Sequence, residues 1–94
     1  MEDIVLSEAL TRWGDESQMG MAIEEAAEFI VALRKCSRVG GREVSADANK
    51  AVIDEIADIT IMARQMALIF GVAEVDQRIK YKIDRLKTRL ENSK

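Results

Sequence analysis

The chain of 94 residues contains no histidine and no proline, and it has one cysteine, five glycines and few aromatic residues. The absence of histidine excludes Ser-His-Asp and Cys-His catalysis, histidine-based zinc sites and the Glu-x-x-His ligands of di-iron helical bundles. Because Cys36 is the single cysteine, no intrachain disulfide forms, and a reducing compartment suits the protein. The side chains that remain for catalysis or metal binding are carboxylates. A metal site with oxygen ligands alone that also binds phosphates favours Mg²⁺ or Mn²⁺.

The sequence also lacks an uninterrupted apolar stretch of about 18 residues, and its first residues include Glu2 and Asp3 rather than a basic signal region. We therefore expect a soluble, cytoplasmic protein with no membrane partner. The net charge is −3, with 7 basic and 13 acidic side chains in residues 1–73 but 7 and 4 in residues 74–94. This overall deficit of positive charge argues against a dedicated nucleic-acid-binding protein, although the C-terminal part is basic.

Sparse turn residues and helical spacing of the apolar side chains predict an all-α fold in a single domain spanning residues 1–94. Asp3 and Asp15 are predicted N-caps, and Gly14 and Gly71 are predicted helix ends. A loop of about ten residues, 38–47, separates the two long helices and ends in the N-cap candidates Ser45 and Asp47. The four predicted helices are Ile4 to Trp13, Asp15 to about Ser37, about Ala46 or Ala48 to Phe70, and about Glu74 to Asn92.

A chain this short has a small core, so we expect a homo-oligomer: a dimer or a dimer of dimers built from helical hairpins in a four-helix-bundle assembly. The last predicted helix carries an apolar stripe at spacings of four and three residues, with charged residues on its other faces. The stripe consists of Val75, Ile79, Ile83, Leu86 and Leu90.

Acidic residues recur three positions apart on both long helices, at Glu25 and Glu28 and again at Glu55 and Asp58. This spacing places each pair on one helix face. The second pair falls on the same arc as apolar residues that should point at a partner helix: Val52, Ile59, Met62, Met66 and Ile69. Because antiparallel helices bring the two pairs together, the acids need protons or a divalent cation between them. The alternative is that these acids lie on a solvated face.

The arrangement Glu-Glu-x-x-Glu, a gap and Glu-x-x-Asp resembles the signature of the MazG-like all-α nucleoside triphosphate pyrophosphohydrolases. Most of the chain is covered by the resemblance. The segments that carry it are Trp13-Gly14, Glu16-Ser17-Gln18, Ala22-Ile23-Glu24-Glu25-Ala26-Ala27-Glu28 and Glu55-Ile56-Ala57-Asp58.

The resemblance implies a helical oligomer that binds Mg²⁺, with Mn²⁺ as a substitute, and cleaves a nucleoside triphosphate to the monophosphate and pyrophosphate. Glu25, Glu28, Glu55 and Asp58 match the metal ligands of the family. Glu24 matches the extra acid of the signature, and it is predicted to orient a ligand because it turns about 100° away from Glu25. We expect a deoxynucleoside triphosphate as substrate and a house-cleaning role in the nucleotide pool.

Four further residues are candidates for substrate binding. Trp13 suits stacking on a nucleobase or packing in the core equally well. We expect Gln18 to be an exposed helix residue; the alternative is that its amide, which both donates and accepts hydrogen bonds, binds the edge of a base. Lys82 and Arg85 share a face of the last helix and either meet the triphosphate or form a solvated charged surface. The family often has Asn four residues after the lysine, whereas this chain has Leu86.

Three alternative functions stay open at this stage. The first is the same fold acting on another substrate, such as phosphoribosyl-ATP. The second is a non-enzymatic helical oligomer that serves as an interaction module. The third is a sensor that binds a nucleotide without hydrolysing it.

Overall fold

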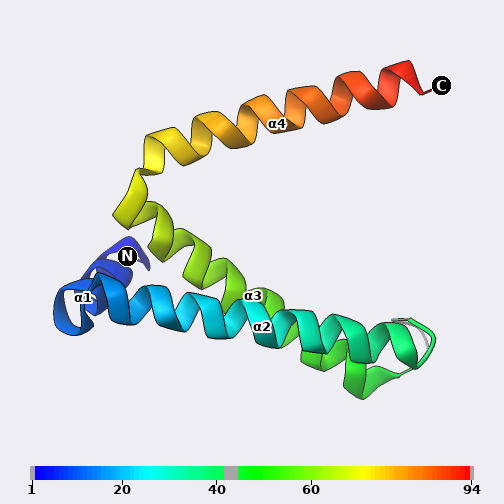
Figure 1. Cartoon of the computed structure of the whole chain (residues 1–94), viewed down its shortest axis with the longest axis horizontal. Helices are drawn as coiled ribbons and strands as arrows, with labels where there is room; N and C mark the ends of the chain where they lie inside the picture. The colour runs from blue at the N-terminus through cyan, green and yellow to red at the C-terminus, as the bar shows by residue number, and fades with distance from the viewer. Residues whose placement is uncertain (1, 42–44, 94) are drawn as a thin grey trace.

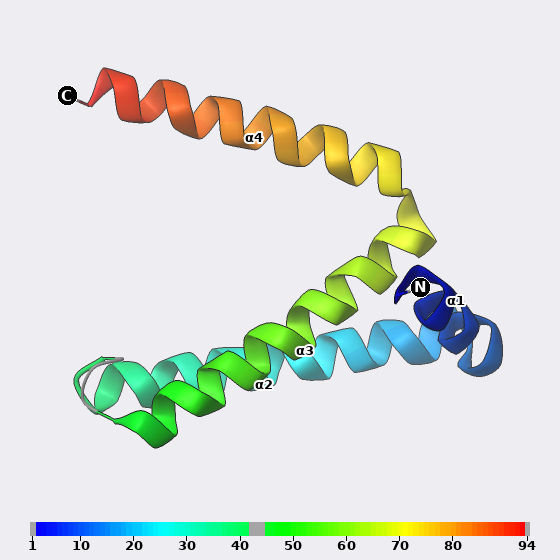
Figure 2. The same ribbon diagram turned by 180° about the vertical axis from the view of Figure 1, so that it is seen from behind.

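The computed structural model describes residues 2–41 and 45–93, and this part of the chain forms four α-helices (Figures 1 and 2). The predicted all-α class is confirmed, whereas the oligomeric bundle stays a prediction. The helices are α1 (Glu2–Trp13), α2 (Asp15–Arg38), α3 (Ala46–Phe70) and α4 (Val72–Asn92). Residues 42–44 of the predicted loop lie outside the described residues.

Helices α2 and α3 form an antiparallel hairpin and lie side by side in both views of the molecule (Figures 1 and 2). Ser45 caps α3, since its Oγ accepts a hydrogen bond of 3.1 Å from the backbone N–H of Ala48. Few side chains are fully enclosed: the buried residues of the described chain are Gln18, Ala32, Cys36 and Gln65. The hairpin thus fixes the positions of its side chains without enclosing a large apolar core.

The short helix α1 packs against the end of the hairpin that lies far from the 38–47 loop. Two polar contacts between described residues connect α1 to α3. The Nε2 of Gln65 donates a hydrogen bond of 3.3 Å to the backbone oxygen of Leu6, and Arg64 forms an ion pair of 2.8 Å with Glu2. The Gln65 side chain is only 1% exposed, so the first contact fills the junction between the two helices.

Helix α4 leaves the hairpin at Gly71, where the chain bends by 119° between α3 and α4 (Figure 1). Gly71 has φ 129°, a conformation that side chains with a Cβ rarely adopt, and its N–H closes α3 on the carbonyl of Ala67. In the described chain α4 contacts α3 alone. Its apolar stripe is therefore exposed over its whole length, from 36% at Val75 to 61% at Leu90.

The structure corrects three predicted helix starts. Helix α1 begins at Glu2, so Asp3 lies inside its first turn rather than at its N-cap. Gly14 is the N-cap of α2, and Asp15 is its first residue. Helix α4 begins at Val72 instead of Glu74 because a single glycine makes the turn. In all three cases an acid in the first turn stabilises the partial positive charge of the helix N-terminus.

Within the described residues, no helix by itself has the length and apolar character needed to cross a membrane. Helices α3 and α4 meet those criteria of length and composition only as a pair, with the sharp bend between them.

Candidate metal centre

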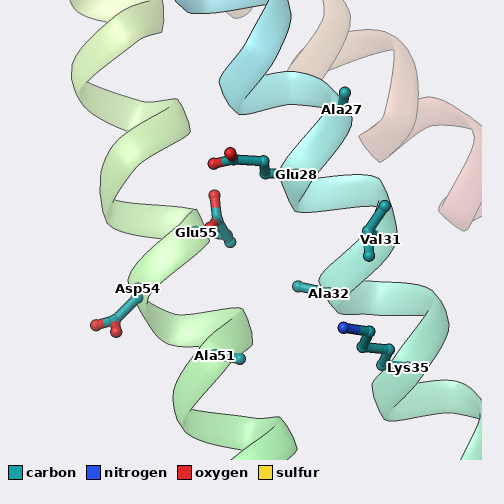
Figure 3. Close-up of a pocket in the computed structure, with 8 residues that line it drawn as sticks. All are labelled: Ala27, Glu28, Val31, Ala32, Lys35, Ala51, Asp54 and Glu55. Atoms are coloured by element: carbon teal, nitrogen blue, oxygen red, sulfur yellow. The ribbon is translucent and has the colours of Figure 1, made fainter.

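Three glutamates from the two long helices converge at the middle of the hairpin. Glu25 and Glu28 come from α2, Glu55 comes from α3, and each offers a carboxylate oxygen within 4.8 Å of the others. Figure 3 shows Glu28 and Glu55 extending into the space between the helices from opposite sides. The predicted meeting of acids from both helices is therefore confirmed for these three residues.

The antiparallel pairing explains why these side chains meet. The three-residue spacing places Glu25 and Glu28 on neighbouring turns of one face of α2, and the hairpin brings Glu55 opposite them. Glu25 and Glu55 are half-buried, whereas Glu28 is exposed. One oxygen of Glu25 and one of Glu55, the Oε2 atom in each case, is buried without a hydrogen-bond partner among the described residues. Buried carboxylate oxygens are unfavourable unless a proton or a cation satisfies them.

The pKa values of the two half-buried glutamates reflect the same crowding of negative charge. Partial removal from water raises the pKa of Glu25 from 4.5 to about 7, and the negative charges of Glu28, Asp58 and Glu55 add to this shift. The pKa of Glu55 is also raised, first by removal from water and then by the charges of Glu28 and Asp58. With no cation bound, the cluster thus retains a proton at a pH where an ordinary glutamate is ionised.

The other two predicted acids differ in their relation to this cluster. Asp58 is exposed and does not belong to the group of three, yet its charge acts on both half-buried glutamates. This makes Asp58 a neighbour of the cluster and a candidate for a fourth oxygen ligand. Glu24 is exposed and lies outside the group. The ligand-orienting role of Glu24 stays a prediction.

The donor set suits a hard divalent cation. It consists of carboxylate oxygens alone, with no sulfur or nitrogen ligand, and two of its oxygens have no other partner. Mg²⁺ and Mn²⁺ fit this chemistry.

No protein-family model, curated protein or solved structure matches the chain. The MazG-like resemblance therefore rests on the acid pattern and its flanking residues, and its consequences for function are proposals.

The two predicted base-binding residues behave differently from each other. Trp13 is 61% exposed at the end of α1, so packing in a core of this chain does not explain it. A side chain available for stacking is consistent with this exposure. Gln18 is only 5% exposed, and the expectation of an exposed position was wrong. Its place in the first turns of α2, where α1 packs on the hairpin, accounts for this burial.

Lys82 and Arg85 lie on α4, which diverges from the α2–α3 hairpin after the turn at Gly71 (Figure 1). Both are exposed, and the Arg85 guanidinium lies 6.0 Å from the centre of the Tyr81 ring. Since α4 contacts only α3 near their shared turn, the described chain does not bring these bases to its own acids. Their predicted contact with the triphosphate thus needs a second chain.

One basic residue beside the cluster was not predicted from the sequence. Lys35 lines the same stretch of the hairpin as Glu28 and Glu55. The available signal was its position seven residues after Glu28, which places both side chains on one face of α2 two turns apart.

Proposed function

We propose that this chain is the subunit of a Mg²⁺-dependent nucleoside triphosphate pyrophosphohydrolase similar to the MazG-like enzymes. The reaction is hydrolysis of a nucleoside triphosphate, a deoxynucleotide in particular, to the monophosphate and pyrophosphate, as cytoplasmic house-cleaning of the nucleotide pool. The observation that carries the proposal is the pair of buried, unpartnered oxygens of Glu25 and Glu55 in a cluster whose acids match the family signature.

Glu25, Glu28 and Glu55 would hold the cation, with Asp58 beside them. When bound, Mg²⁺ supplies positive charge for the phosphate oxygens and makes a water more acidic. Carboxylate oxygens that do not ligate the cation accept hydrogen bonds and so orient that water. Overall, water adds across one phosphoanhydride bond: its oxygen bonds to phosphorus, pyrophosphate and monophosphate separate, and the released proton passes to solvent.

A homo-oligomer is part of the proposal, as a dimer or a dimer of dimers. Its support is the exposed apolar surface, because soluble monomers rarely leave a continuous apolar stripe uncovered. The α4 stripe is such a surface, and further exposed apolar residues lie on the hairpin. Those on α2 and α3 include Ile23, Ile30, Val31, Ile53, Ile56 and Phe70.

The direct test is a pyrophosphate-release assay over ribo- and deoxyribonucleoside triphosphates with and without Mg²⁺. Glu28→Gln and Asp58→Asn each remove one negative charge with little change of shape, and we expect each to lower turnover by more than the roughly 10- to 100-fold that is typical when an outer-shell partner of a metal ligand is lost. Glu91→Gln is the control, because Glu91 is an exposed acid near the end of α4, outside the glutamate cluster and the segments that carry the family resemblance. Circular dichroism checks that helical content is unchanged.

The alternatives predict different results when phosphoribosyl-ATP is added to this panel and when nucleotide binding and melting temperature are measured beside pyrophosphate release. Turnover of phosphoribosyl-ATP alone favours that substrate. Tight nucleotide binding without product indicates a sensor. An interaction module shows neither product release nor a rise in melting temperature with Mg²⁺. Wild-type turnover in either acid variant removes that residue from the site.

A further inference from the structure

A pocket of about 440 Å³ lies between α2 and α3 beside the glutamate cluster (Figure 3). Glu28 and Glu55 lie at one end of the pocket, and Lys35 lies at the other end. The pocket is therefore bipolar, with carboxylates at one end and an ammonium group at the other. Its volume lies within the range of about 300–1,000 Å³ that is usual for small-molecule sites.

Small residues create this hollow. Ala32 on α2 and Ala51 on α3 lie between the acidic and basic ends, and each presents only a methyl group there (Figure 3). A methyl group cannot bridge the gap between two helices, so the space stays open to a ligand. Val31 adds an apolar wall on the α2 side. Asp54 also lines the pocket, but its carboxylate points away from α2 (Figure 3).

The position of Lys35 follows from helix geometry. Seven residues separate it from Glu28, which corresponds to about 10.5 Å along the helix axis on nearly the same face. Its ammonium nitrogen is directed toward α3, into the pocket (Figure 3). Lys35 makes no ion pair with any described residue, because the ion pairs found there are Arg12 with Glu8 and Arg64 with Glu2. Its positive charge is thus available to an anion.

We propose that Lys35 binds the phosphate that lies farthest from the carboxylate-held cation when a chain of linked phosphates occupies the pocket. This inference rests on the proposed function, which provides the cation at the acidic end. A ligand that meets both ends carries negative charge over about two helical turns, and linked phosphates do so, whereas a single phosphate held by the cation does not. Lysine suits this role, since its ammonium binds phosphate as a compact charge. The pocket therefore selects substrates and products with linked phosphates over monophosphates.

The test compares Lys35→Ala, Lys35→Arg and Arg34→Ala in the full-length protein, with dATP, dCTP, dGTP and dTTP as substrates and Mg²⁺ present. Arg34 is the matched control because it is an exposed base on the same helix, turned about 100° away from Lys35. We expect Lys35→Ala to raise KM roughly tenfold or more, as the loss of one charge-assisted contact predicts, with a much smaller change in kcat. In Lys35→Arg the KM should return most of the way to the wild-type value, and Arg34→Ala should have the KM of the wild type.

Calorimetry separates this inference from the proposed function on which it rests. Mg²⁺ alone binds wild type and Lys35→Ala equally well, whereas imidodiphosphate with Mg²⁺ binds Lys35→Ala roughly tenfold more weakly. If wild type binds Mg²⁺ and releases pyrophosphate but Lys35→Ala matches Arg34→Ala, the role of Lys35 is wrong and the proposed function stands. Equal losses in Lys35→Ala and Lys35→Arg also overturn that role, because they show that charge is not what matters. If wild type neither binds Mg²⁺ nor turns over any nucleotide, both proposals fall.

Discussion

The α2–α3 hairpin and helix α4 are built from helices of similar length, 24 and 25 residues against 21, but they differ in what covers them. The two hairpin helices pack on each other and position the glutamate cluster, whereas α4 contacts the rest of the described chain only near its start. The two regions also differ in their balance of acidic and basic residues. Helices α2 and α3 together carry nine acidic and five basic residues, and α4 carries four acidic and six basic residues.

The hairpin and α4 show that a sequence can form a helix without burying that helix in the same chain. A helix of about 20 residues is marginal in water unless its apolar face packs against something. The two hairpin helices meet that demand in part by packing on each other, whereas α4 contacts only α3. In the proposed homo-oligomer a second copy would cover α4, and the acidic hairpin of that copy would suit the basic faces of α4.

The largest expected effect comes from a charge on the α4 stripe. Ile83 is 58% exposed in the single chain but lies at the centre of the stripe. Ile83→Glu would place a carboxylate inside the proposed contact between chains, where burial of an unpaired charge is costly. We expect the mass measured by light scattering to fall to that of one chain of 10.5 kDa, with loss of helical content.

Thr88→Glu is the matched control for this variant. Thr88 is exposed on the same helix, about 140° from Ile83, and the change introduces the same charge away from the stripe. It should keep the mass of the wild type. If Ile83→Glu behaves like Thr88→Glu, the stripe is not the contact surface and the contrast between hairpin and α4 loses its explanation.

A smaller effect is expected from pH, and it arises in the hairpin alone. The folded protein holds the pKa of Glu25 at about 7, above its ordinary value of 4.5. Below about pH 4.5 the folded and unfolded chains both carry this proton. As pH rises toward 7 the unfolded chain releases it first, so this contribution to stability is lost over that window and stays lost above it.

Glu25→Gln removes this dependence because glutamine does not ionise. In EDTA, we expect the melting temperature of wild type to fall between about pH 4.5 and 7. The variant should show a shallower fall and a higher melting temperature than wild type at pH 8. Adding Mg²⁺ reverses the order, since the cation stabilises the wild-type carboxylate. A steeper fall in Glu25→Gln than in wild type would contradict this account of the cluster.

Local sequence patterns predicted most of the helices and the meeting of three glutamates in the candidate site. Residue spacing indicated the four helices, the break at Gly71 and the cap at Ser45, because each depends on interactions within a few residues. The meeting of Glu25 and Glu28 with Glu55 was also predictable, since a short loop between long helices permits little other than an antiparallel pair.

The missed features depend on packing between distant segments. Gln18 is buried near the end of the hairpin where α1 packs, and nothing in its own neighbourhood predicts that burial. The contact of Lys82 and Arg85 with the triphosphate stays a prediction, and the angle of α4 on which it depends is set at the glycine turn rather than by the spacing of these residues. Lys35 was overlooked because it becomes notable only when small residues leave a pocket beside it.

The smallest expected effect compares two serines at helix ends, one in each region. Ser45 accepts a hydrogen bond from the N–H of Ala48 at the start of α3, and Ser93 donates one of 3.0 Å to the carbonyl of Leu90 at the end of α4. Ser45→Ala should lower the free energy of unfolding by about 1 kcal/mol, because the N-cap holds a helix that packs along the hairpin. Ser93→Ala should change it by less than about 0.5 kcal/mol, since an exposed helix end frays independently of global unfolding. Chemical denaturation at fixed protein concentration measures both. Equal losses in the two variants would show that the end of α4 is as firmly held as the hairpin, which the exposure of Ser93 argues against.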